Sequence, residues 1–204
     1  MDTKSLIQIP GYIYNEYLLV LNPHEELRNK IMEIKTKFSD TYKVPNARWS
    51  KPHITLANFV QFEMMEGKLV NRLRIIAMGY HPFKVELKGF GSFPSHTIFI
   101  NVESQLQVKT LVTELRPAQR LMTLNKDNKP HFIDNPHLTV ARKLLPWQYE
   151  QAWIQYQQQH FSGRFMANGM LLLKRSLNGG SYQLVQWFEF MNLPVNTRQG
   201  ALFG

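Results

Sequence analysis

The chain contains no cysteine among its 204 residues. It therefore has no disulfide, no thiolate nucleophile and no cysteine-ligated zinc, which fits a reducing compartment. It also lacks a hydrophobic run of about 20 residues, the length that a membrane-spanning helix needs. The first residues, Met1-Asp2-Thr3-Lys4, are not followed by the apolar segment of a secretory signal. These absences predict a cytoplasmic protein with no membrane anchor.

Acidic residues are scarce relative to basic ones. The 15 Asp and Glu residues face 24 Lys and Arg residues, so the formal net charge is +9. This charge favours polyanionic partners such as nucleic acid, although its even spread along the chain equally suits an ordinary solvated surface. The length predicts one domain, 1–204, of two lobes, and residues 191–204 carry no pattern and are expected to form a mobile tail.

One short motif occurs twice, each time after a proline. His53-Ile54-Thr55-Leu56 follows Pro52, and His137-Leu138-Thr139-Val140 follows Pro136. Because side chains alternate along a strand, each His shares a face with its Thr, while the apolar residues occupy the other face. Two such strands would present two imidazoles and two hydroxyls to one cleft.

This set of groups suits acid/base chemistry on a phosphate without a metal. One imidazole can deprotonate the incoming oxygen and the other can protonate the departing one, since imidazole titrates at about pH 6.5. The hydroxyls of Thr55 and Thr139 would donate to the phosphate oxygens, and their β-branched side chains have few rotamers. The sequence leaves open whether His53 or His137 is the acid.

The remaining pattern predicts an α+β fold with an internal duplication. The order strand, helix, His/Thr strand, helix recurs in both halves, at a spacing too long for a solenoid. The expected strands are 12–21, 52–60, 83–93, 97–102, the strand of the second motif, 164–175 and 181–190. The expected helices are 22–42, 61–78, 106–122 and 146–160, and a long loop is expected at 123–135.

Further segments around the motifs resemble the 2H phosphoesterase superfamily, in particular its bacterial 2′,5′ RNA ligase-like, or cyclic phosphodiesterase, branch. Besides the two motifs, these segments are Ala47-Arg48-Trp49, Phe90 to Pro94, Ala141-Arg142, and Leu173 to Ser176 followed by Tyr182. The resemblance covers about residues 12–190. It implies a bilobal LigT-like fold in which two antiparallel sheets face a central cleft, helices lie outside, and a pseudo-twofold axis relates the halves.

The resemblance also implies an activity. Such enzymes open 2′,3′-cyclic phosphates of RNA ends or nucleotides to 2′-phosphates without metal or other cofactor, and the reverse reaction forms a 2′,5′ linkage. It makes His53, Thr55, His137 and Thr139 the catalytic set. It also makes Arg142 and Tyr182 candidates for substrate contacts. From their chemistry alone, Arg175 is a further candidate for phosphate and Trp49 for base stacking.

Other interpretations remain open at this point. The same residues would serve hydrolysis of 2′,5′-oligonucleotides or other small phosphodiesters, and the basic chain would suit an RNA-binding module with little turnover. The spacing of His131, Asp134 and His137 allows a metal site, but no second ligand cluster accompanies it, so we expect no metal. We expect a monomer whose partners are its substrates, RNA ends or cyclic nucleotides.

Overall fold

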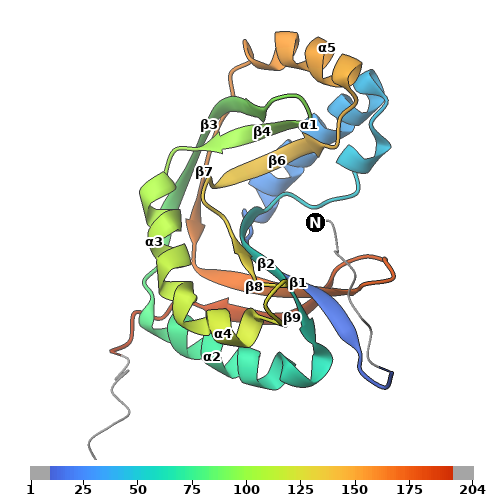
Figure 1. Cartoon of the computed structure of the whole chain (residues 1–204). Coiled ribbons are helices and arrows are strands. Elements are labelled where there is room, and N and C mark those ends of the chain that lie inside the picture. Colours follow the sequence, from blue (N-terminus) through green and yellow to red (C-terminus); the bar gives the residue numbers. More distant parts are fainter. Residues whose placement is uncertain (1–9, 195–204) are drawn as a thin grey trace, which may run out of the picture.

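The computed structural model describes residues 10–194, which form an α+β structure of two lobes (Figure 1). The strands are β1 (Tyr14–Leu21), β2 (Ile54–Phe62), β3 (Phe83–Phe93), β4 (Thr97–Val102), β5 (His131–Phe132), β6 (His137–Arg142), β7 (Ser162–Ala167), β8 (Gly169–Ser176) and β9 (Gln183–Glu189). The helices are α1 (Glu25–Tyr42), α2 (Glu66–Gly79), α3 (Gln105–Leu115), α4 (Gln119–Met122) and α5 (Pro146–Tyr156). Within the described residues, no helix has the length and apolar character needed to span a bilayer.

The strands form an antiparallel sheet that is narrow in the middle. Their order is β7-β3-β4-β6-β2-β1-β8-β9, and β5 lies beside β2. The central strands β6 and β2 are joined by one residue pair, Leu138 with Ile54. We call β7-β3-β4-β6 the upper half and β2-β1-β8-β9 the lower half, as they lie in Figure 1. These halves correspond to the two antiparallel sheets expected from the sequence.

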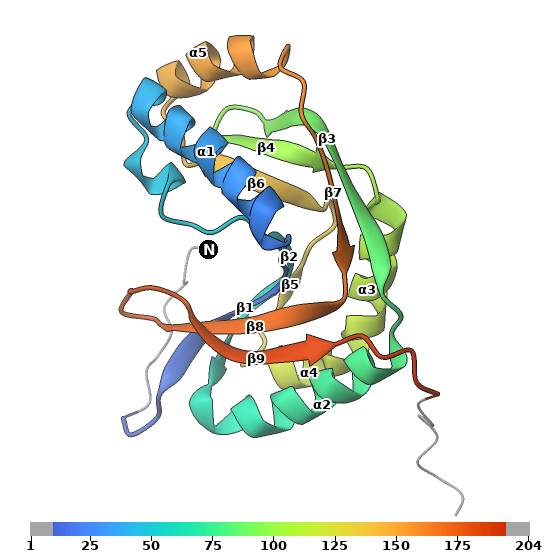
Figure 2. The same ribbon diagram turned by 180° about the vertical axis from the view of Figure 1, so that it is seen from behind.

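Helices cover each half from outside. α1 packs on β6 and β7 and beside α5, whereas α2 packs on β9, and α3 and α4 pack on β2. Figure 2 shows the same arrangement from behind, with α1 across the upper half and α2 along the lower half. α1 leads into β2 but covers the upper half, which contains β6. α3 and α4 lead into β6 but cover the lower half, which contains β2. This exchange in both directions is what a pseudo-twofold arrangement requires.

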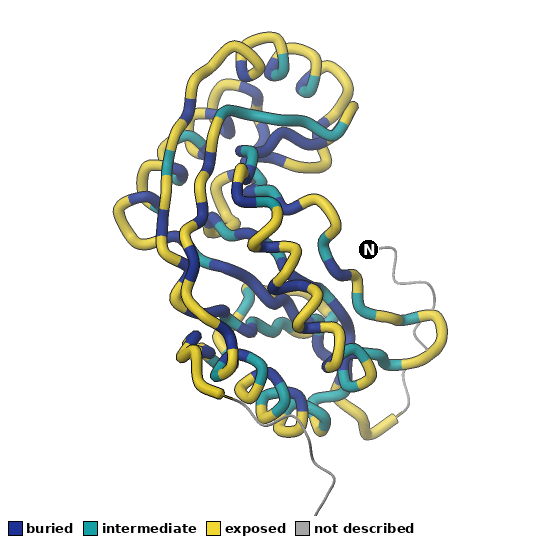
Figure 3. The backbone as a smooth tube through the Cα atoms, turned by 90° about the vertical axis from the view of Figure 1, so that its left-hand side faces the viewer, coloured by how far each residue is buried: buried dark blue, intermediate teal, exposed yellow. Residues whose placement is uncertain are grey.

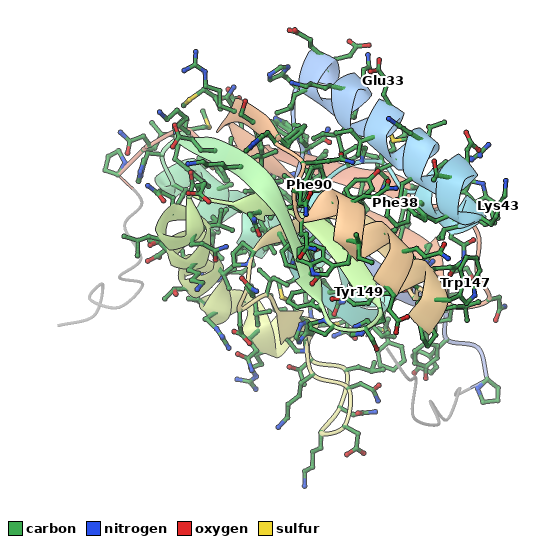
Figure 4. The ribbon with its side chains drawn as sticks, turned by 90° about the horizontal axis from the view of Figure 1, so that it is seen from above. Glu33, Phe38, Lys43, Phe90, Trp147 and Tyr149 are labelled. Atoms are coloured by element: carbon green, nitrogen blue, oxygen red, sulfur yellow. The ribbon has the colours of Figure 1, made fainter. Side chains whose placement is uncertain are left out.

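Burial follows these layers. Figure 3 shows largely buried strands and helices that are exposed on their outer sides. Between α1 and α5, the ring of Phe38 lies 5.2 Å from that of Tyr156, which in turn meets Phe90 of β3 edge-on at 4.9 Å. Figure 4 shows Phe38 turned toward α5 and Glu33 turned away from it. The apolar face of α1 therefore fixes this helix on the upper half of the sheet.

Two helix predictions need correction. The expected helix 61–78 begins later, because β2 continues to Phe62 and a 3-10 turn precedes α2. The expected helix 106–122 is interrupted after Leu115 by a 3-10 turn that contains Pro117. Proline has no backbone N–H to continue the α-helical ladder, so α3 ends there and α4 starts anew.

The expected strand 164–175 is also wrong as a single strand. It consists of β7, which pairs with β3 in the upper half, and β8, which pairs with β1 in the lower half. The chain crosses between the halves at Asn168. At the predicted tail, the backbone N–H groups of Asn192 and Leu193 donate to the carbonyls of Tyr80 and Met78. Residues 195–204 of that tail lie outside the described part of the chain.

Candidate active site

Both motif histidines are held by the same local hydrogen bond. Nδ1 of His53 lies 2.7 Å from the carbonyl oxygen of Lys51, and Nδ1 of His137 lies 2.7 Å from that of Asn135. A carbonyl oxygen only accepts, so Nδ1 carries the proton and Nε2 of each neutral ring is unprotonated. In both motifs a proline separates the ring from its acceptor and restricts the backbone between them. Each ring is therefore oriented with a basic nitrogen directed away from its anchor.

The two motifs share one face of the sheet. Ile54 and Leu138 pair across β2 and β6 and have 0% exposure, because they point into the core. The His and Thr on either side of each are half-buried, which places them on the opposite face, as the alternation predicts. Since the strands are antiparallel, this register sets the histidine of each motif beside the threonine of the other. We call this side of the sheet the histidine face.

His137 packs against two phenyl rings. The centroid of its ring lies 5.0 Å from that of Phe93, at the end of β3, and 4.9 Å from that of Phe99 in β4. Removal from water lowers the pKa of His137 below its usual value. The sequence gives no signal for Phe99, whose position depends on the pairing of β4 with β6.

His53 lies in a more positive environment. Removal from water is the largest cause that lowers its pKa to about 4, and the charges of Lys35, Arg142 and His137 act in the same direction. The hydrogen bond to the Lys51 carbonyl opposes this shift. At neutral pH the ring is therefore uncharged, and its Nε2 can accept a proton.

A β-bulge follows each motif threonine. On β6 the extra residue is Val140, which has no partner on β4 where its neighbours do. On β2 it is Leu56, which has no partner on β1 in the same way. A bulge shifts the alternation of side chains by one residue. The pseudo-twofold relation thus extends to this irregularity of the backbone.

The bulge on β6 turns Arg142 onto the histidine face. Thr139 pairs with Phe99 of β4, and Arg142 pairs with Thr97. Thr97 and Phe99 are two residues apart on one strand, so they and their partners share a face. Arg142 forms no hydrogen bond or ion pair with the described residues, and its charge lowers the pKa of His53. It is therefore available to an anion bound at this face.

Tyr182 and Arg175 form a group in the lower half. Nε of Arg175 donates to Oε2 of Glu16 at 2.7 Å, and its guanidinium lies 4.7 Å from the centroid of the Tyr182 ring. Burial, followed by the charge of Glu16, raises the pKa of Tyr182, whereas Arg175 and Arg142 lower it. Tyr182 thus lies within electrostatic reach of Arg142. The structure gives Arg175 a role in holding Tyr182, and a direct phosphate contact stays a prediction.

Within residues 10–194, no hydrogen bond, ion pair or ring contact ties Trp49 to the histidine face. Its side chain is 72% exposed on the segment that leads to His53. It has no ring contact with the other residues of 10–194, so its stacking on a base stays a prediction. In that same range, no group of three or more His, Asp or Glu side chains could hold a metal ion. His131, the first residue of the metal pattern considered above, instead pairs with Asn58 across β5 and β2.

The motifs give no indication of Lys35 on α1. Its side chain is 1% exposed, and Nζ donates to Oγ of Ser50 at 3.0 Å and to the carbonyls of Thr139 and Val140 at 3.1 and 3.2 Å. Burial and then the charge of Arg142 lower its pKa to about 8. The signal available in the sequence is a lysine on the apolar face of a helix.

The fold and the paired motifs define a class of two-lobed α+β proteins built around two His/Thr strands. A sequence model of the 2′-5′ RNA ligase superfamily matches residues 23–179, which include both motifs. The chain therefore belongs to this superfamily. The match confirms the predicted membership of the 2H phosphoesterase superfamily and its 2′,5′ RNA ligase-like branch. The cytoplasmic location and the monomeric state stay predictions.

Relatives and solved structures agree with this assignment. A predicted phosphoesterase of Geobacillus thermodenitrificans is 27% identical over 150 residues, which are 71% of this chain and 79% of that protein. Another from Geobacillus kaustophilus is 24% identical over 176 residues, 85% and 95% of the two chains. Escherichia coli LigT complexed with 3′-AMP superposes with a TM-score of 0.62 at 14% identity, covering 87% and 98%. TT0787 of Thermus thermophilus gives 0.57 at 20% identity, covering 86% and 98%. These structures confirm the predicted LigT-like fold.

Proposed function

We propose that the protein is a metal-independent phosphodiesterase that opens 2′,3′-cyclic phosphates of RNA ends or nucleotides to 2′-phosphates. The observation that carries this proposal is the pair of Nδ1-anchored imidazoles on one face with the unpaired cation Arg142. The nucleotide in the LigT complex supports a nucleotide substrate. With a 5′-hydroxyl in place of water, the same opening of the cyclic phosphate would form a 2′,5′ linkage.

The two histidines differ in their surroundings, and this difference supports a division of the acid and base roles between them. Nε2 of His53 takes a proton from the attacking water, because burial and, to a smaller extent, the nearby cations keep this ring neutral. His137 gives its proton to the 3′-oxygen as the bond between that oxygen and phosphorus breaks. Its pKa is also lowered, but the cause is burial against phenyl rings, and a bound phosphate anion raises it again. One proton enters the base and one leaves the acid in each turnover.

Three further side chains stabilise the charge that develops on the phosphate. The hydroxyls of Thr55 and Thr139 have no hydrogen-bonding partner among the described residues and can donate to the two nonbridging oxygens. Arg142 adds a fixed positive charge on the same face. This arrangement supplies the acid, the base and the donors from the protein itself.

The pH dependence of the reaction follows from the two pKa shifts. Activity requires neutral His53, whose pKa is lowered to about 4, and protonated His137, whose pKa is lowered from 6.5. We therefore expect kcat/KM to fall below about pH 4 and to fall again on the basic side at a pH below 6.5, with its maximum between these two limbs. Measurement of kcat/KM on a small 2′,3′-cyclic nucleotide from pH 3.5 to 9 tests this. A maximum above pH 7.5 would be incompatible with it.

Gly91 of β3 provides a test of the wall behind His137. A Cβ at this position would overlap the Phe99 ring and the amide oxygen of Asn101. We expect Gly91→Ala to press Phe99 against His137, to lower kcat by about 10-fold and to destabilise the fold by about 1–3 kcal/mol. The matched control is Gly67→Ala in α2, where a Cβ meets nothing within 4 Å. Kinetics and thermal melting compare the two variants, and equal behaviour would refute the expected overlap.

A substrate panel tests the proposed function against its alternatives. It contains RNA with a 2′,3′-cyclic end, small 2′,3′-cyclic nucleotides, and 2′,5′-linked oligonucleotides, each with excess chelator. We expect hydrolysis of the cyclic substrates. Turnover of the 2′,5′ oligonucleotides alone would instead favour the small-phosphodiester alternative. RNA binding without any turnover, unaffected by loss of both histidines, would favour a binding module.

A further inference from the structure

Lys35 occupies a position at which both motifs come together. Its ammonium accepts nothing and has three hydrogens to donate, and all three are used. Two go to the carbonyls of Thr139 and Val140 in the second motif, and the third goes to Ser50, three residues before His53. A single buried charge thus ties the approach of the first motif to the strand of the second.

The two carbonyl contacts identify what Lys35 holds. In a regular strand, consecutive carbonyls point to opposite edges, so one ammonium cannot reach both. Here it does so because Val140 is the extra residue of the bulge. β2 pairs with β6 at Leu138 alone, so the edge of β6 beyond it is left to Lys35. This is the same bulge that turns Arg142 onto the histidine face.

At the equivalent bulge on β2, a backbone N–H group binds the carbonyl in place of a charged side chain. At the bulge on β2, the carbonyl of Leu56 accepts from the backbone N–H of Ile133, which follows β5. The place equivalent to Arg142 there holds Asn58. Two half-sites with the same backbone design thus differ in their cations, since Lys35 and Arg142 both belong to one of them. Lys35 has no ion-pair partner among residues 10–194, so its charge is not compensated by a carboxylate in that range.

We propose that Lys35 is a positioning residue for phosphate. Lys35 holds the bulge at Val140 so that Arg142 faces the substrate, and a bound phosphate compensates the buried positive charge of Lys35. This inference rests on the proposed function, since it names how the same site admits its anion. Lys35 acts through Thr139 and Arg142 and touches no reacting atom.

A double-mutant cycle with inorganic phosphate as the probe tests this role. The variants are Lys35→Met, Arg142→Gln and the double variant, and binding is measured by calorimetry at pH 7 together with thermal melting. We expect Lys35→Met and Arg142→Gln each to weaken phosphate binding by about 10-fold, and the double variant to be little worse than either, because both act through one arrangement. The control is Lys37→Met, an exposed lysine on the same helix, which should bind as the wild type does.

The pH profile separates positioning from simple structural support. Loss of the Lys35 charge removes one of the causes that lower the pKa of His53, so the acid limb of kcat/KM should move upward from about pH 4 in Lys35→Met. Unchanged phosphate affinity with an unmoved acid limb would overturn the proposal, as would fully additive losses in the cycle. Phosphate binding requires no turnover, so an inactive wild type that still binds phosphate would refute the proposed function and leave this cycle informative.

A pH titration of anion affinity with Lys35 in place tests the proposal if Lys35→Met does not fold. In the free protein the pKa of His53 and that of His137 lie below pH 7, so Lys35 is the group of the three that titrates between pH 7 and 9.5. The titration uses His137→Ala, because a bound anion raises the pKa of His137. The pKa of Lys35 is lowered to about 8. The probe is sulfate, which keeps its charge over this range whereas phosphate does not, and we expect its affinity to fall by about 3- to 10-fold. Constant affinity across this range would overturn the proposal.

Discussion

Alanine at His53 or at His137 is expected to lower kcat on 2′,3′-cyclic nucleotides by about 10²- to 10⁴-fold, the range that a positioned acid or base contributes. Each imidazole is oriented by its own hydrogen bond from Nδ1 to a backbone carbonyl, so neither ring can take over the proton transfer of the other. The loss should appear in kcat, because proton transfer occurs in the transition state. Steady-state kinetics of both variants measure it.

A substrate with an activated leaving group separates the two roles. A p-nitrophenyl phosphodiester releases its leaving group without a proton, so it has no need of an acid. His137→Ala should therefore recover most of its activity on this substrate, whereas His53→Ala should stay impaired on both. The matched control is His160→Ala, an exposed histidine after α5, which should retain wild-type rates. Equal losses for both variants on the activated substrate would contradict the assignment of His53 as base and His137 as acid.

Arg142→Gln is the second change with a large expected effect, a loss of about 10²- to 10³-fold in kcat/KM. The bulge at Val140 brings this guanidinium onto the histidine face, where no described side chain neutralises it. Glutamine keeps hydrogen-bonding capacity but removes the charge that stabilises the developing phosphate charge. The loss should therefore be accompanied by weaker inhibition by phosphate and by a smaller dependence of kcat/KM on salt.

Arg164→Gln is the control for net charge. Arg164 is exposed on β7, at the opposite edge of the upper half from β6. Arg164→Gln lowers the formal charge by the same amount as Arg142→Gln. It should leave kcat/KM within about 2-fold, because solvent and salt screen an exposed charge that lies far from the histidines. If the two arginine variants lose activity equally, long-range attraction by the basic chain explains substrate capture and Arg142 has no specific role.

The paired motifs could be predicted because their signal is local. A period of two places His and Thr on one face of a strand, and the structure confirms that face by the burial of Ile54 and Leu138. The proline before each histidine is also visible in the sequence. The consequence of this proline is a backbone carbonyl placed to accept from Nδ1. That geometry depends on the path of the folded backbone and could not be derived from residue types.

The rest of the site depends on contacts between distant segments. The bulges at Leu56 and Val140 have no residue signature, since they arise from the register with β1 and β4. Ile31, Ile34 and Phe38 recur at helical spacing and predict an apolar helix face. In the structure Ile34 is half-buried, and Lys35 is the residue enclosed by the core. A lysine among apolar positions was a usable signal, although its three acceptors lie on other elements. The division of 164–175 into β7 and β8 is nonlocal in the same sense, because both parts are extended and differ in their partner strands alone.

Product analysis of one reaction tests whether the two histidines open a 2′,3′-cyclic phosphate without a metal. Wild type and a variant with both histidines replaced by alanine are incubated with a 2′,3′-cyclic nucleotide in excess chelator, and the products are separated as 2′- and 3′-phosphates. We expect the wild type to produce the 2′-phosphate at a rate unaffected by the chelator, and the double variant to produce none above the uncatalysed rate. A wild type that requires metal, or a double variant that keeps wild-type activity, would contradict this expectation.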